Sequence, residues 1–119
     1  MSFLLFIVAS VLKSAIAIIG YLIGFFSSLI KGEFKKYHLH LAISIDQYGN
    51  CLCQYLFNSL LITKEGYKFG NIDETISSVL GKNKMSKNLT GLGRCLDYLL
   101  NLFEKDHSIK SIDNSVNDN

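Results

Sequence analysis

The stretch "FLLFIVASVLKSAIAIIGYLIGFFSSLI", residues 3–30, decides the fold of this 119-residue chain. It is apolar apart from one charge, Lys13, and four serines. As a helix it rises about 42 Å at ~1.5 Å per residue, which exceeds the hydrocarbon core of about 30 Å. The sequence therefore predicts a transmembrane anchor over residues 1–30.

A secretory signal peptide is the alternative interpretation of this apolar run. Such a peptide needs a basic segment before the apolar run and a small-residue cleavage site after it. The opening residues "MSF" carry no basic side chain, and no A-x-A-like site follows the run. The sequence therefore favours an uncleaved anchor.

The flanks of the apolar run predict its orientation. Lys31, Lys35 and Lys36 follow it, in a basic juxtamembrane collar over residues 31–37, whereas no Lys or Arg precedes it. Basic side chains remain on the cytoplasmic side of a bilayer and attract anionic lipid. We therefore expect a protein of the bacterial inner membrane, with its N-terminus outside and its C-terminus in the cytoplasm.

Small residues follow one row of the predicted anchor. Gly20, Gly24 and Ser28 recur at every fourth position, and residues 20–24 form a G-x-x-x-G motif. A row of small residues lets two helices approach closely in lipid. The row predicts helix packing and weak homo-oligomerisation, although glycines are also common in transmembrane helices that do not pair.

The charge balance excludes one class of partner. Lys and Arg number 12 and Asp and Glu number 10, whereas a nucleic-acid binder has a strong basic excess. The three cysteines, Cys51, Cys53 and Cys95, are odd in number and lack zinc-site spacing. We expect them to be reduced packing residues, and we expect no nucleic acid, metal or cofactor.

Residues 38–62 carry two competing periods. Residues 38–45 alternate strictly, as in a strand, with "YGN" as a hairpin turn. A helical period fits a longer window, with one apolar stripe: Leu41, Ile45, Tyr48, Leu52, Tyr55 and Leu56. A polar row recurs at every fourth position: Asp46, Asn50, Gln54 and Asn58. Strands rarely run this long, so the sequence favours helix, with the hairpin as the alternative.

The stretch "NIDETISSVLGKNK", residues 71–84, is typical of a capped short helix. Asn71 is placed to cap the helix, with Glu74 three residues later. Asp73 and Glu74 complement the positive end of the helix dipole. Gly81 is a good C-terminal stop for such a helix.

A further helix is expected near residues 92–105. Its apolar face consists of Leu92, Cys95, Leu96, Leu99 and Phe103. Residues 106–119 contain few apolar side chains and are expected to form a disordered tail. The sequence thus predicts a mainly α protein: an anchor, a small helical module over residues 38–105, and the tail.

Four segments resemble a family of small uncharacterised bacteriophage and prophage proteins. They are "SIDQYGN" (44–50), "FGNIDETISSVLGKNK" (69–84), "GLGRCLDYLL" (91–100) and "DHSIKSID" (106–113). The family pattern reads D-Q-x-x-N, then P-D-E-T-[IL]-S-S, then D-H-C. This chain has Ile72 in place of the proline and Ser108 in place of the cysteine. The resemblance implies a phage or prophage origin and favours helix over residues 38–62, but it implies no activity.

The sequence therefore predicts a membrane protein whose module binds a host or phage protein, in lysis control or host-envelope modification. The candidate binding residues are Asp46, Asn50, Asp73, Glu74, Ser77, Ser78 and His107. One alternative is a structural or assembly subunit of a virion-like particle. Another alternative is a metal-dependent enzyme. Its oxygen ligands and its general base would come from Asp46, Asp73, Glu74 and His107, with Ser77 or Ser78 near the substrate.

Overall fold

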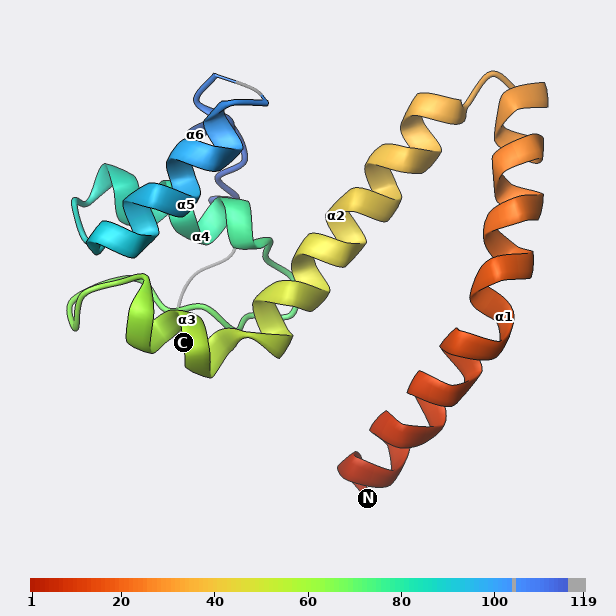
Figure 1. Ribbon diagram of the computed structural model, residues 1–119, viewed down its shortest axis with the longest axis horizontal. Helices are drawn as coiled ribbons and strands as arrows, with labels where there is room; N and C mark the ends of the chain where they lie inside the picture. Colours follow the sequence, from red (N-terminus) through yellow and green to blue (C-terminus); the bar gives the residue numbers. More distant parts are fainter. Residues whose placement is uncertain (104, 116–119) are drawn as a thin grey trace. The chain divides into compact units, whose positions relative to one another are not determined.

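The computed structural model describes residues 1–103 and 105–115, and within these ranges the chain is mainly α (Figure 1). The helices are α1 (Ser2–Ile30), α2 (Phe34–Leu52), α3 (Gln54–Leu60), α4 (Ile76–Met85), α5 (Gly91–Asn101) and α6 (His107–Lys110). The described residues contain no strand, and a single antiparallel bridge joins Ile62 to Leu89. The predicted helical content is confirmed, including α2 and α3 in place of a hairpin.

The N-terminal helix α1 has the dimensions of a membrane span. It is 29 residues long, and none of its most apolar window is buried against the rest of the protein. Among the described helices, it alone is long and apolar enough to cross a membrane. A signal sequence near an N-terminus has the same length and composition, so α1 could serve as either one.

The chain divides into two compact units, and the boundary between Leu41 and Ala42 falls inside α2. In the first unit, α1 and the start of α2 form a helical hairpin. Gly32 has a φ of +71° in the turn, and the Glu33 N–H donates to the Ser28 carbonyl over 2.8 Å. Aromatic rings join the two helices: the ring centroids of Phe25 and Phe34 lie 5.2 Å apart.

The predicted packing row of α1 is partly occupied by the chain itself. A Cβ built on Gly24 would lie 2.1 Å from the Tyr37 hydroxyl of α2, and Ser28 is buried. Only Gly20 faces open space, with nothing within 4 Å. Two copies that pair through the whole row would therefore have to displace Tyr37. The spacing of small residues in the sequence does not predict this contact.

The second unit begins at Ala42 and has a small apolar core. The core consists of Leu61, Ile62, Phe69, Val79, Leu80 and Leu89. It gathers residues from the loop between α3 and α4, from α4 itself, and from the turn before α5. Val79 and Leu80 of α4 are fully buried.

The predicted disordered tail is wrong for residues 106–115. Residues 107–110 form α6, which lies beside α4 (Figure 1). Gly81 allows this packing, because a Cβ there would lie 2.2 Å from the Ser108 carbonyl oxygen. The expected helix stop at Gly81 is likewise wrong, since α4 continues to Met85. Residues 116–119 of the predicted tail lie outside the described residues.

Several helices of the second unit bury polar side chains and expose apolar ones. Asn50 of α2 and Asp97 of α5 are buried, whereas Leu52 and Leu99 on the same helices are exposed. On α3, Tyr55 is 85% exposed. The expected apolar stripes exist, but they do not form the core.

Candidate functional site

Three asparagines hold the loop between α3 and α4 by pairing with its backbone. Asn58 accepts from the Phe69 N–H over 2.8 Å and donates to the Phe69 carbonyl over 3.1 Å. Asn83 makes the same pair of bonds with Tyr67, each 2.8 Å long. A side-chain amide offers one acceptor and two donors, so it substitutes for a neighbouring peptide group.

Asn50 is the third of these asparagines and makes the most contacts with the loop. Its Oδ1 accepts from the Gly70 N–H over 2.9 Å. Its Nδ2 donates to the carbonyls of Asn71 and Glu74 over 3.1 and 2.7 Å. Both donors of this fully buried amide are used, so Asn50, a predicted binding residue, is committed to the fold.

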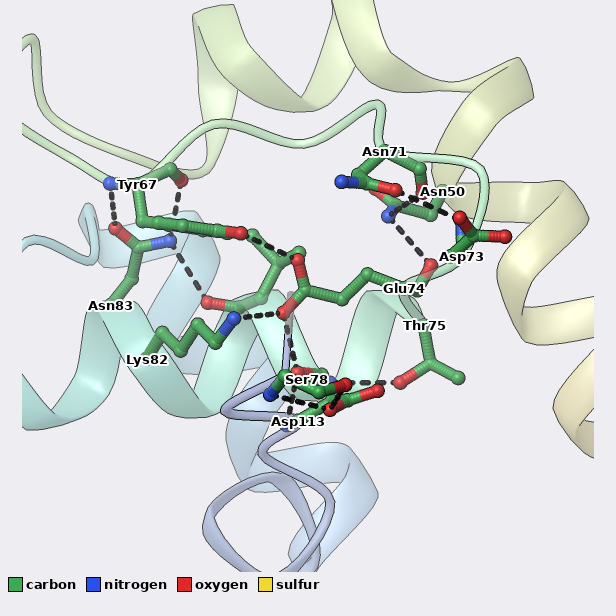
Figure 2. Close-up of polar contacts among 12 residues, drawn as sticks. Asn50, Tyr67, Asn71, Asp73, Glu74, Thr75, Ser78, Lys82, Asn83 and Asp113 are labelled. Atoms are coloured by element: carbon green, nitrogen blue, oxygen red, sulfur yellow. Dashed lines mark hydrogen bonds and ion pairs between the residues drawn. The ribbon is translucent and has the colours of Figure 1, made fainter. Parts of the chain in front are cut away.

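Glu74, just before α4, is the centre of a second buried polar group, which joins the preceding loop to α4 (Figure 2). Its Oε1 lies 2.6 Å from the Lys82 ammonium and accepts from the Ser78 hydroxyl, also over 2.6 Å. Its Oε2 accepts from the Tyr67 hydroxyl over 2.8 Å. Lys82 in turn lies over the Tyr67 ring, 4.3 Å from its centroid. Both carboxylate oxygens are therefore occupied by internal partners.

The cap of α4 differs from the predicted one. Thr75, and not Asn71, caps the helix, and its Oγ1 accepts from the Ser78 N–H over 3.0 Å. Asn71 instead accepts from the Asp73 N–H over 3.0 Å. The predicted N-cap lies four residues before the observed one, and Glu74 interacts with Lys82 and Ser78 instead of reaching back to a cap.

Asp46 of α2 supplies a second, long-range cap to the same helix. Its Oδ1 accepts from the Ile76 N–H over 2.9 Å, and its Oδ2 accepts from the Ser77 hydroxyl over 2.9 Å. The Ser77 oxygen also lies 3.2 Å from Nε2 of His107. Three predicted site residues, Asp46, Ser77 and His107, thus meet, although they come from α2, α4 and α6.

The order of these three groups argues against a catalytic triad. In a triad the carboxylate orients the imidazole, and the imidazole takes the proton of the serine. Here the Asp46 carboxylate binds the hydroxyl of Ser77 directly, and Ser77 is buried. The hydroxyl proton is directed at the carboxylate, so this arrangement joins α2, α4 and α6 and does not activate a nucleophile.

A third polar group, which sequence reasoning missed, attaches α6 to α5. The buried Asp97 lies 2.8 Å from the Lys84 ammonium and accepts from the Ser108 hydroxyl. Asn101 donates to the same carboxylate over 3.3 Å. The sequence signal for this polar group was the aspartate at position 97, among the apolar residues of α5. Ser108 is fully buried here.

The remaining predicted site residues are arranged for no common ligand. The side chain of Asp73 is exposed, whereas that of the neighbouring Glu74 is buried. Ser78 accepts from the Asp113 N–H over 2.8 Å. The hydroxyl and N–H of Ser115, which donate to the Asp113 carboxylate, lower the pKa of Asp113 below its usual value.

Within the described ranges, no three His, Cys, Asp or Glu side chains gather to hold a metal ion. Every buried side-chain nitrogen or oxygen there also has a hydrogen-bond partner. The buried candidate residues therefore form satisfied internal contacts. Comparison with known proteins gives no match to a protein-family model, a curated protein or a solved structure.

Proposed function

We propose that the chain is a single-pass membrane protein of phage or prophage origin that presents a helical interaction module, residues 42–115, to the cytoplasm. The observation that supports this function is the inverted polarity of the module. Its polar side chains are used in internal bonds, whereas its helices expose apolar stripes. A surface of this kind is suited to contact with a partner, because burying apolar area drives association.

The same observation argues against the enzyme alternative. A catalytic group has to reach a substrate, but Glu74 and Ser77 are buried and hydrogen-bonded to other parts of the module. Recruiting either group would break bonds that hold α4 in place. Lysis control and host-envelope modification are the candidate biological roles for a phage membrane protein, with a host or phage protein as the partner.

The orientation is tested by fusing alkaline phosphatase or green fluorescent protein to the C-terminus. We expect an inactive phosphatase fusion and a fluorescent protein fusion, because Lys31, Lys35 and Lys36 hold their side of the span in the cytoplasm. We also expect the chain to resist carbonate extraction. Changing the three lysines to glutamine is the matched control and should raise phosphatase activity. An active wild-type phosphatase fusion would overturn the orientation.

The interaction is tested by photocrosslinking in cells through an unnatural amino acid. We expect protein adducts from Tyr55 and Leu56, which are exposed apolar residues of α3. The exposed Lys64 of the following loop is the control position and should give few adducts. Mass spectrometry then identifies a host protein, a phage protein, or a particle subunit as the partner. If Tyr55 and Leu56 give no more adducts than Lys64, the interaction-module proposal fails.

A further inference from the structure

Large apolar side chains are exposed along α5 and in the turn that follows it. The α5 face comprises Leu92, Tyr98 and Leu99 of the helix with Leu102 and Phe103 of the turn, and these side chains are 49% to 91% exposed. At about 100° per residue, the three helical members lie on one side of α5. Gly93 and Asp97 lie on the opposite side and are buried.

The side of α5 that packs on the module is held by close backbone approach and charge. A Cβ on Gly93 would lie 2.2 Å from the Leu61 carbonyl oxygen. Asp97 is bound to Lys84, and Thr90 caps the helix by accepting from the Gly93 N–H over 3.2 Å. These contacts fix α5 in its orientation, so the α5 face points away from the core.

Two exposed basic side chains lie near the N-terminal end of α5: Lys87 in the turn before the helix, and Arg94 one turn before Tyr98, at the edge of the α5 face. A hollow of about 410 Å³ is lined by Lys84, Lys87, Leu89, Arg94 and Asp97. Lys84 neutralises Asp97, whereas Lys87 and Arg94 are exposed. The sequence from Lys84 to Lys105 holds four basic residues and two acidic ones, the second acid being Glu104. The region therefore combines an exposed apolar stripe with excess positive charge.

We propose that the α5 face docks onto an anionic lipid bilayer. The rings and leucines would enter the interface, while Lys87 and Arg94 meet headgroup phosphates. Helices that lie in a membrane interface combine these two features, an apolar face and flanking cations. A second copy fits less well, because two symmetric copies joined through this face would bring their own cations together. This inference rests on the proposed function, in which α1 places the module at a membrane.

The test uses the full chain reconstituted into vesicles and a fluorescent probe on Cys95. Cys95 is exposed on α5, and changing Cys51 and Cys53 to serine leaves it as the single thiol. An environment-sensitive nitrobenzoxadiazole label is attached, and the vesicles contain phosphatidylcholine with or without phosphatidylglycerol. We expect blue-shifted emission that nitroxide-labelled lipids quench, more strongly in the anionic vesicles. The same label on Lys64→Cys, in a chain that also carries Cys95→Ser, should remain in water.

Two sets of variants separate the apolar and the electrostatic parts of the docking. Leu99→Glu with Phe103→Glu should abolish the quenching, and both positions are exposed, so the fold is left intact. Lys87→Gln should reduce the ratio of docked to undocked α5 about fivefold in anionic vesicles and leave it unchanged in neutral ones. Lys64→Gln makes the same charge change at another exposed lysine and should have no effect.

Flotation of the vesicles, read together with the Cys95 probe, distinguishes three outcomes that would contradict the docking. A chain that floats with vesicles while the Cys95 probe remains in water would overturn the docking and leave the anchor standing. A probe shielded in proportion to protein density, without quenching by lipid, would identify a second copy as the occupant and would also overturn the proposal. A chain that does not float at all would overturn the anchor and the docking together.

Discussion

Replacing Glu74 with alanine is expected to lower the free energy of unfolding of the module by about 3 to 5 kcal/mol. The substitution removes one member of a buried ion pair and leaves Lys82 without its carboxylate. It also removes the acceptor for the hydroxyls of Ser78 and Tyr67. Breaking such a pair costs more than the pair contributes, because the remaining charge keeps its desolvation penalty.

Urea unfolding of the full chain in a mild detergent, followed by tyrosine fluorescence, measures this change. Asp73→Ala is the matched control, since it removes the adjacent carboxylate from an exposed position and should change stability by no more than about 0.5 kcal/mol. Equal losses in the two variants would show that Glu74 acts only through the helix dipole.

Asn50→Ala is expected to have the second-largest effect, a loss of about 3 kcal/mol, because it leaves buried backbone groups without partners. Asn50 binds the Gly70 N–H and the carbonyls of Asn71 and Glu74, all in the loop that leads to α4. Alanine is a good helix former, so the loss would not arise from α2 itself.

Hydrogen exchange locates the effect of Asn50→Ala. We expect faster exchange of the Gly70 amide together with a lower unfolding free energy of the whole module. Gln47→Ala is the control on the same helix, since Gln47 makes one exposed bond to the Asp73 carbonyl over 3.1 Å. A loss of less than about 0.5 kcal/mol in Asn50→Ala would contradict a structural role for this residue.

Local periodicity was enough to predict the helices and the long apolar span. It was not enough to predict which face of each helix is packed. The polar row along α2 and α3 and the apolar stripe beside it are equally visible in the sequence. The usual expectation is that the apolar stripe packs in the protein core. Asn50 and Asn58 reverse that assignment, because they bind loop backbone that lies 11 to 24 residues further along the chain.

The sequence did not show which of the candidate residues come together. Asp46, Ser77 and His107 are separated by about 30 residues from one to the next, so their meeting depends on how three helices pack. The tail was misjudged for a related reason. Its composition is polar, yet Ser108 is buried because Asp97 of α5 accepts its hydroxyl.

The polar interior of the module has a thermodynamic consequence. The heat-capacity change of unfolding rises with the apolar surface exposed and falls with the polar surface exposed. Among the described residues, the module keeps six apolar side chains in its buried core and exposes many others while folded. Its unfolding releases buried amides and carboxylates into water, so its heat-capacity change should be small for its length. A small change flattens the curve of stability against temperature, so the module's resistance to unfolding should vary little with temperature.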